Sequence, residues 1–185
     1  MARIVVHTCC APCAVYPYTL MHRIYDAVFF FYNPNIHPAV EFARRRDEVK
    51  RFAERSDMRF VVEAGDEAAW EEAIRGYENE PERGRRCERC FRFRLSKTAE
   101  YAGRIGATEF TTVMSISPHK DTAMLDRIGA DVSAASGVEY IPVDFKKNDG
   151  FKKASVLSRA EGFYRQNYCG CRYSMRCGPP ERLFS

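Results

Sequence analysis

Apolar and polar positions along the chain follow two different periods, and together they predict strands that alternate with helices. Short apolar runs of the kind buried in a parallel sheet occur at residues 3–8, 27–32, 60–62, 110–114 and 137–142. Between these runs, apolar residues recur at helical spacing over residues 13–25, 39–56, 66–75, 87–105 and 121–135. This alternation predicts an open, mostly parallel α/β sheet with helices on both faces.

The predicted order brings several loops to one edge of the sheet. Residues 7–13 follow the first strand, and loops around His37 and His119 follow the second and fourth strands. Because the carboxyl ends of parallel strands open on the same side, these loops should face one crevice. After Asp144 the strand pattern ends, and we expect a polar, aromatic-rich tail that bears cysteines. The sequence contains no internal repeat, so residues 1–185 are predicted to form a single domain.

Eight cysteines among 185 residues are the most unusual feature of the composition. No apolar segment approaches the ~20 residues that a membrane span requires, and Met1 leads into a strand without the apolar region of a signal peptide. We therefore expect a cytoplasmic protein that does not bind a membrane. In that compartment thiols stay reduced, and groups of cysteines bind metals or carry out redox chemistry more often than they form structural disulfides.

The first cysteine group, Cys9, Cys10 and Cys13, lies where the first strand passes into a helix. The helix dipole there favours thiolates. Since neighbouring side chains of an extended chain point to opposite faces, one tetrahedral ion should not easily bind both Cys9 and Cys10, and a cluster or two separate centres fits better. Cys10-Ala-Pro-Cys13 is also the pattern of a thioredoxin-like dithiol. Residues 7–13 contain no glycine, so the usual backbone cradle for ATP or a dinucleotide is absent.

Further cysteines lie downstream in two groups and one single position. Cys87 and Cys90 have a common metal-ligand spacing at the start of a helix, which is also the spacing of half a structural zinc site. Cys169 and Cys171 would close a very small ring if oxidised, which suits a labile redox pair or two metal ligands. Cys177 has no partner at a useful spacing and is interpreted as an incidental thiol.

Basic residues are clustered, although the net charge is only +4. Local positive patches can hold phosphates, and each could equally be a solvated helix face. The clusters lie at residues 44–46, 83–94 and 146–153.

Six motifs resemble one known family in their order along the chain. They are His7-Thr-Cys-Cys-Ala-Pro-Cys13, Phe31-Tyr-Asn-Pro-Asn-Ile36, Arg86-Cys-Glu-Arg-Cys-Phe-Arg92, Ile116-Ser-Pro-His-Lys120, Asp144-Phe-Lys-Lys147 and Tyr164-Arg-Gln-Asn-Tyr-Cys-Gly-Cys171. Together they resemble the QueH family of epoxyqueuosine reductases, and only the residues from about Tyr173 lie outside the resemblance. The resemblance implies an adenine-nucleotide alpha-hydrolase-like (Rossmann-like) fold and an iron–sulfur cluster. It also implies the last step of queuosine biosynthesis, the reduction of epoxyqueuosine to queuosine at the wobble position of tRNA, without cobalamin.

That chemistry suggests roles for the cysteines. Amino acids supply electrons poorly, and the most economical ligand set for a [4Fe–4S] cluster is Cys9, Cys10, Cys87 and Cys90. A spare thiol such as Cys13 could bind an additional iron, which would act as a Lewis acid on the epoxide C–O bond. Cys169 and Cys171 either ligate iron or cycle between dithiol and disulfide, and their spacing favours the second.

The remaining predicted site residues serve proton transfer and tRNA binding. His119 is the expected proton donor, with Asp144 and Asp149 as alternatives. Bases of the single-stranded anticodon loop should stack on aromatic rings, and phosphates should meet basic side chains. The predicted tRNA contacts are Lys120, Lys146, Lys147, Lys152, Lys153, Arg165, Tyr32, Tyr164 and Tyr168. The reaction also implies an electron donor, which the sequence does not identify.

Two other classes of function remain open at this point. A zinc-stabilised RNA-binding module would have no catalysis, and a thiol–disulfide oxidoreductase using Cys10 and Cys13 would need no metal. The absorption spectrum of anaerobically purified protein, together with iron and sulfide analysis, distinguishes all three classes.

Overall fold

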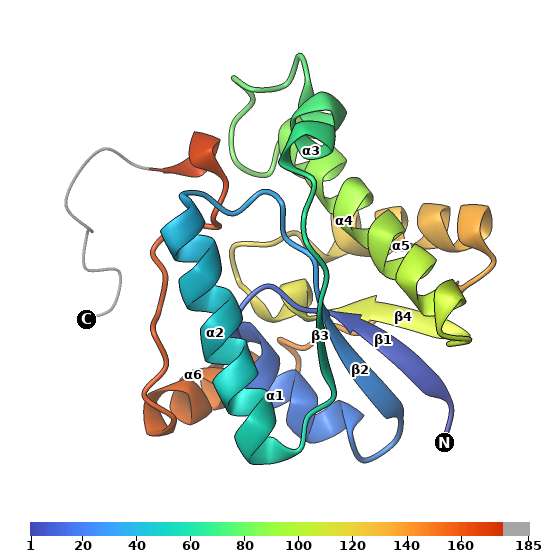
Figure 1. The fold of residues 1–185 in the computed structure, drawn as a ribbon, viewed down its shortest axis with the longest axis vertical. Helices are drawn as coiled ribbons and strands as arrows, with labels where there is room; N and C mark the ends of the chain where they lie inside the picture. Colours follow the sequence, from blue (N-terminus) through green and yellow to red (C-terminus); the bar gives the residue numbers. More distant parts are fainter. Residues whose placement is uncertain (176–185) are drawn as a thin grey trace.

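A computed structural model describes residues 1–175 and contains a sheet of five parallel strands (Figure 1). The strands lie in the order β3-β2-β1-β4-β5, so the order reverses after β1 and creates a switch point between β1 and β4. The predicted open parallel sheet is confirmed. The strand bounds are Arg3–His7 for β1, Asp26–Phe31 for β2, Phe60–Val62 for β3, Glu109–Thr112 for β4 and Glu139–Tyr140 for β5.

Helices cover both faces of this sheet (Figure 1). α1, α2 and α6 pack on one face, α4 and α5 pack on the other, and α3 packs against α4. No helix within residues 1–175 is both long enough and apolar enough to cross a membrane. The helix bounds are Ala11–Met21 for α1, Ala39–Ser56 for α2, Glu67–Ile74 for α3, Arg85–Arg104 for α4, Thr122–Ser136 for α5 and Gly150–Ala160 for α6.

Two short 3₁₀ turns lie close to the carboxyl edge of the sheet. The first, η1 (Val113–Ile116), follows β4 directly, so residues 113–114 belong to this turn and not to the predicted fourth strand. The second, η2 (Arg172–Ser174), follows the C-terminal cysteine pair. The loop after β4 therefore leaves the sheet earlier than the apolar run indicates.

The two faces of the sheet have separate apolar cores because side chains alternate along each strand. Val6 and Phe31 belong to the core formed with α1, α2 and α6. Val5 and Phe30 belong to the core formed with α4 and α5. Burial on both faces explains why these strands are continuous apolar runs in the sequence.

Helix α6 replaces part of the irregular tail expected after Asp144. A Cβ at Gly150 would lie 1.7 Å from the carbonyl oxygen of Phe145, so only glycine fits at the start of this helix. The buried residues of α6 are small or polar and give little apolar periodicity: Gly150, Ala154, Ser155 and Ser158. Because α6 packs closely against α1 through small side chains, a sequence pattern of large apolar residues does not predict this helix.

The C-terminal segment, residues 161–175, runs from α6 past α2 toward the carboxyl edge of the sheet (Figure 1). The backbone N–H of His37, in the loop after β2, donates a hydrogen bond of 2.8 Å to the carbonyl of Gly170. This contact brings the cysteines on either side of Gly170 to the edge where the first strand ends.

Gly129→Ala is expected to destabilise the fold because α5 packs closely on Tyr140 at this position. A Cβ there would lie 2.4 Å from the Tyr140 ring, and overpacking of this kind costs about 1–3 kcal/mol. Gly103→Ala on α4 is the matched control, since the nearest atom to its Cβ would be 3.9 Å away and Ala stabilises a helix by roughly 0.5–1 kcal/mol relative to Gly. Urea unfolding followed by circular dichroism measures both. Equal stability of the two variants would contradict this packing.

Candidate active site

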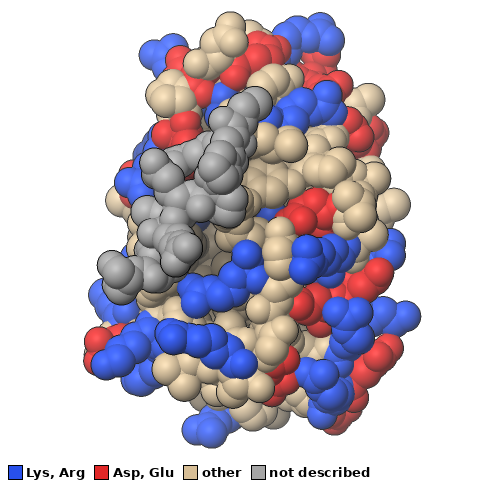
Figure 2. All heavy atoms as spheres, turned by 90° about the vertical axis from the view of Figure 1, so that its left-hand side faces the viewer, with Lys and Arg blue, Asp and Glu red and all other residues tan. Residues whose placement is uncertain are grey.

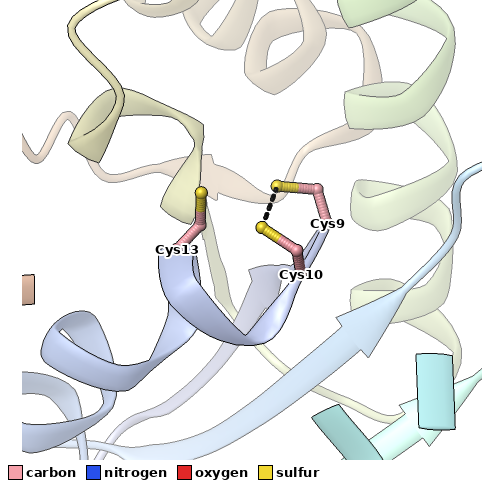
Figure 3. Close-up of side chains that lie close together, drawn as sticks. All are labelled: Cys9, Cys10 and Cys13. Atoms are coloured by element: carbon pink, nitrogen blue, oxygen red, sulfur yellow. Dashed lines mark hydrogen bonds between the residues drawn. The ribbon is translucent and has the colours of Figure 1, made fainter. Parts of the chain in front are cut away.

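The first cysteine group surrounds the start of helix α1 (Figure 3). β1 ends at His7, and Cys10 is the N-cap residue of α1 with an extended backbone. The sulfurs of Cys9 and Cys10 are 3.8 Å apart, and those of Cys9, Cys10 and Cys13 all lie within 4.8 Å of one another. A strand-to-helix junction therefore gathers three thiols.

This arrangement contradicts the expectation that Cys9 and Cys10 point to opposite faces. That expectation treats an extended backbone as enough to separate the two sulfurs, but they lie 3.8 Å apart although Cys10, the residue before the helix begins at Ala11, is extended. Two thiolates bound at about 2.3 Å to one tetrahedral ion would lie about 3.8 Å apart, which is the separation of these two sulfurs. A single ion could therefore bind both.

Four more thiols converge from the start of α4 and from the C-terminal segment. Cys87 and Cys90 are buried in the first two turns of α4. Together with Cys169, Cys171 and Cys9 of the first group, they line a cavity of about 40 Å³. Segments far apart in the sequence thus bring five sulfurs to one small cavity. None of the seven cysteines within residues 1–175 is in a disulfide.

A larger cavity of about 430 Å³ lies beside the small one. Cys9, Met114, Lys120 and Cys169 line both cavities, so these four residues separate them. The larger cavity has the volume of an ordinary small-ligand site, and its lining combines apolar side chains with amide, hydroxyl and basic groups. A ligand of nucleoside size bound there would lie next to three cysteine side chains, those of Cys9, Cys13 and Cys169.

A buried arginine holds the C-terminal segment against α2. The side chain of Arg45 is 2% exposed and forms an ion pair of 2.7 Å with Glu41. It also donates hydrogen bonds of 3.2 and 3.1 Å to the carbonyls of Tyr168 and Cys169. Gly170 has a φ of +103°, and a Cβ there would lie 3.1 Å from Nη1 of Arg45. The course of this segment thus depends on a buried charge and on a glycine.

Side-chain contacts also tie the first cysteine group to the C-terminal segment and hold the cysteine pair in place within that segment. Nε2 of Gln166 donates a hydrogen bond of 2.9 Å to Sγ of Cys10. Sγ of Cys169 lies 2.9 Å from the hydroxyl of Ser174, which donates to the carbonyl of Cys171 at 2.8 Å. The geometry of the cysteines therefore requires that this segment is docked.

Hydrogen bonds within the first cysteine group favour a thiolate at Cys9. Its pKa lies well below the usual value because Cys10 and Cys13 donate hydrogen bonds to its sulfur and the Arg94 guanidinium is near. The hydrogen bond from Cys13 lowers the pKa of Cys10. The hydrogen bond that Cys10 donates to Cys9 and the burial of Cys10 outweigh this effect and raise its pKa overall, to about 12. Burial and Arg94 lower the pKa of His7 to about 3, so its imidazole is neutral. Cys9 is therefore the anionic sulfur of this group.

The C-terminal pair has the same asymmetry. A hydrogen bond from Cys171 and the charge of Lys120 lower the pKa of Cys169, whereas that hydrogen bond and burial raise the pKa of Cys171. Burial lowers the pKa of Lys120, but Cys169, Glu82 and Cys87 outweigh it and raise the pKa overall. A thiolate and an ammonium group therefore meet at the boundary between the two cavities.

Of the three expected proton donors, His119 alone lines one of these two cavities. His119 is exposed and lines the larger cavity. The carboxylate of Asp144 accepts the backbone N–H of Lys146 at 3.0 Å, and Asp149 precedes α6. Neither aspartate lines either of these two cavities, and their assignment as proton donors stays a prediction.

The prediction that three tyrosines stack on bases is wrong for Tyr32. Tyr32 is 2% exposed and stacks with Phe30 at 6.2 Å between ring centroids, so a base cannot reach its face. Tyr164 and Tyr168 are half-buried. The Arg44 guanidinium lies 3.3 Å from the centroid of the Tyr164 ring, and Tyr168 lines the larger cavity. These two tyrosines stay predicted contacts.

The clusters of basic residues are only partly available to phosphates. Arg45, Arg86 and Arg94 are 2%, 3% and 4% exposed, so residues 44–46 and 83–94 do not form continuous positive surfaces. Each buried guanidinium binds carbonyl or amide oxygens of another segment. These three arginines therefore belong neither to a phosphate-binding surface nor to a solvated helix face.

The basic residues predicted to contact tRNA lie in three settings. Lys147, Lys152, Lys153 and Arg165 are exposed, and Arg165 also lines the larger cavity. Lys146 is half-buried and donates a hydrogen bond to the hydroxyl of Thr122. Lys120 lines both cavities. Figure 2 shows Lys and Arg side chains, with acidic ones among them, on the face that carries α2, α6 and the C-terminal segment.

Several residues of the site have no clear signal in the sequence. Glu82 and Gln166 line the larger cavity, although neither type stands out by spacing. Arg45 does carry a signal, because Glu41 lies four residues before it on the same helix face. Cys177 lies outside the described residues.

The chain matches the model of a known family, described as Epoxyqueuosine reductase QueH, over residues 4–177. The match continues past Tyr173 to Cys177, so the similarity extends further than the six motifs indicate.

Relatives described as Epoxyqueuosine reductase QueH occur in several bacteria. One from Acinetobacter baylyi is 39% identical, and the aligned region covers 94% of this chain and 81% of the relative. One from Thermotoga maritima is 36% identical over 95% of this chain and 91% of the relative. One from Streptococcus pyogenes is 36% identical over 94% of this chain and 70% of the relative.

A solved structure shares the fold. It is described as the predicted subunit of tRNA methyltransferase from Methanocaldococcus jannaschii, and it matches with a TM-score of 0.55 at 13% identity. The match covers 84% of this chain and 76% of that structure. The two proteins therefore share an open α/β fold. On the extent of the family match and of the relatives, the chain belongs to the QueH family of epoxyqueuosine reductases, which are oxidoreductases.

Proposed function

We propose that this chain reduces epoxyqueuosine to queuosine at the wobble position of tRNA. Family membership supports a role in queuosine biosynthesis. The observation that carries the finer proposal is the meeting of five thiols at a small cavity, whose boundary with a nucleoside-sized cavity is formed partly by two of them, Cys9 and Cys169. Electron-rich sulfurs therefore lie next to the larger cavity, which can hold the substrate base.

Loss of the epoxide oxygen as water consumes two electrons and two protons, which ordinary side chains do not supply. A [4Fe–4S] cluster supplies electrons singly, and an iron with an open position polarises a C–O bond. The donor set fits such a group, because the cysteines are free and buried or half-buried and Cys10 lies 3.8 Å from Cys9. We assign Cys9, Cys10, Cys87 and Cys90 as cluster ligands. Cys13, which lies with the first two, is the proposed ligand of an additional iron.

The C-terminal pair can supply the number of electrons that the reaction needs. Oxidation of the Cys169 thiolate and the Cys171 thiol to a disulfide releases two electrons and one proton, and Lys120 or His119 delivers the second proton that loss of the epoxide oxygen as water consumes. An external reductant, whose identity is not assigned, would then restore the dithiol. The lowered pKa of Cys169 supports this role because the thiolate is the reactive form.

Two basic side chains can stabilise or protonate the departing epoxide oxygen. Lys120 stays charged and lines both cavities, and it lies close enough to Glu82 to form an ion pair of 3.1 Å. We propose that its ammonium stabilises the oxygen and that Lys120 or His119 delivers a proton. Within the described chain, only Lys120 of these two is held in place by a charged partner.

The class of function is tested by the metal content of the protein purified without oxygen. A brown protein that contains iron and sulfide supports the proposal. A colourless protein that contains zinc would instead support an RNA-binding module, and the 3.8 Å spacing of Cys9 and Cys10 would suit such an ion. A metal-free protein that reduces disulfides through Cys10 and Cys13 would support a thiol–disulfide oxidoreductase.

Alanine at any of the four proposed ligands, Cys9, Cys10, Cys87 and Cys90, is expected to remove most of the cluster iron and all activity. Each substitution takes away one of the thiolates that hold the cluster. Iron and sulfide analysis of anaerobic samples is the measurement, and Cys177→Ala is the control with nearly unchanged iron. A variant with full iron content would remove that residue from the ligand set.

Serine at Cys169 or Cys171 is expected to leave the cluster iron and its spectrum intact but to prevent repeated turnover. Serine retains the size of the side chain and cannot form a disulfide. Iron analysis and multiple-turnover assays with a chemical reductant measure the two effects separately. Loss of iron from either variant would make that residue a metal ligand and end the redox-pair proposal.

Reversal of three exposed lysines to glutamate, at Lys147, Lys152 and Lys153, is expected to weaken binding to all substrate tRNAs alike. Each lost phosphate contact lowers the log–log salt slope by about 0.9 on a duplex or about 0.7 on a single strand. Titrations of tRNA at several salt concentrations give the slope. Arg23→Glu is the control, because Arg23 is exposed after α1 and before β2, at the opposite edge of the sheet. An unchanged slope in the triple variant would mean that these lysines are merely solvated.

A further inference from the structure

In the part of the chain that the structure describes, two arginines are buried beside the small cavity without an acidic partner. Arg86 and Arg94 are 3% and 4% exposed, and both line that cavity. Within residues 1–175 their hydrogen bonds go only to neutral oxygens. Nε of each is buried with no hydrogen-bond partner there. Buried arginines are almost always paired, because an uncompensated charge in the interior is costly.

The lining of the small cavity shows what could compensate these charges. Among the described residues, the lining contains no aspartate or glutamate. It contains the side chains of Cys9, Cys87, Cys90, Cys169 and Cys171. Thiolates are therefore the anions available to the two guanidinium groups. A set of metal-bound thiolates would supply negative charge at this place.

Arg94 is fixed relative to both cysteine groups. It lies four residues after Cys90 on α4, and both side chains face the cavity. Its guanidinium donates a hydrogen bond of 2.6 Å to Oδ1 of Asn33, and Nδ2 of Asn33 donates one of 2.8 Å to the carbonyl of Thr8. This chain of bonds ends at the peptide bond before Cys9. The positive charge therefore cannot move away from the sulfurs.

We propose that Arg94, together with Arg86, is a positioning residue that neutralises the thiolate-bound centre and raises its reduction potential. This inference rests on the proposed function, because it needs a centre held by these thiolates. Each reduction adds one electron to a group that is already negative, so a buried cation at fixed distance favours the reduced state. Arg94 thus makes the centre easier to reduce by the physiological donor.

Arg94→Met tests this inference because Met fills similar space without charge. Anaerobic titration with dithionite, followed by visible absorption, gives the midpoint potential. At fixed solution potential, the ratio of reduced to oxidised centre should fall at least tenfold, which corresponds to a midpoint about 59 mV lower for a one-electron couple. Arg94→Lys should retain most of the parent potential. Arg92→Met is the matched control, since Arg92 is on the same helix but pairs with Asp131 near the surface.

Each outcome bears on a separate claim. A centre that remains in Arg94→Met with an unchanged potential would overturn the inference and leave the proposed function intact. Loss of the centre from Arg94→Met but not from Arg94→Lys would support a requirement for charge. Loss from both would show that the shape of the arginine matters, and this would also overturn the inference. A parent protein without iron and sulfide would overturn the proposed function and the inference with it.

Discussion

Arg45 binds the carbonyls of Tyr168 and Cys169 from within helix α2, and the C-terminal cysteines depend on this contact for their place. Glu41 balances the buried charge from one turn away. Removal of one partner from a buried ion pair typically costs about 3–5 kcal/mol, so the docked segment is not a loosely held tail. Without it, the small cavity would lose two of its five thiols. The Arg45 guanidinium of α2 therefore holds the C-terminal cysteines at the carboxyl edge of the sheet.

The strand order of the sheet positions the residues of the site that lie outside the C-terminal segment. The strand order reverses between β1 and β4, and the loops that follow these two strands diverge there. Cys9 leaves the end of β1, and Lys120 follows β4, so both reach the boundary between the two cavities. The start of α4 adds Cys87 and Cys90 from the side. No single segment holds the site, which explains why its residues are spread over most of the chain.

Much of this could be predicted from the sequence, and the failures share a physical cause. Continuous apolar strands and thiols at strand ends are local signals, so the sheet and the cysteine groups were predictable. The close approach of the Cys9 and Cys10 sulfurs is set where the strand passes into a helix, and the burial of Tyr32 depends partly on the Phe93 ring of α4. Likewise, Arg94 resembles surface charge in sequence because its partner Asn33 comes from a distant loop. Contacts between residues far apart in the sequence thus determine the features of the site that local sequence patterns do not predict.

The central claim is that thiols from three segments act on a modified base held in the adjoining cavity. The direct test gives anaerobically prepared protein and a chemical reductant a tRNA that carries epoxyqueuosine, then digests the tRNA to nucleosides for mass spectrometry. The account predicts that the epoxyqueuosine nucleoside disappears and that queuosine, lighter by one oxygen atom, replaces it in equal amount. Unchanged epoxyqueuosine, with an intact iron–sulfur centre and bound tRNA in the same sample, would contradict the account.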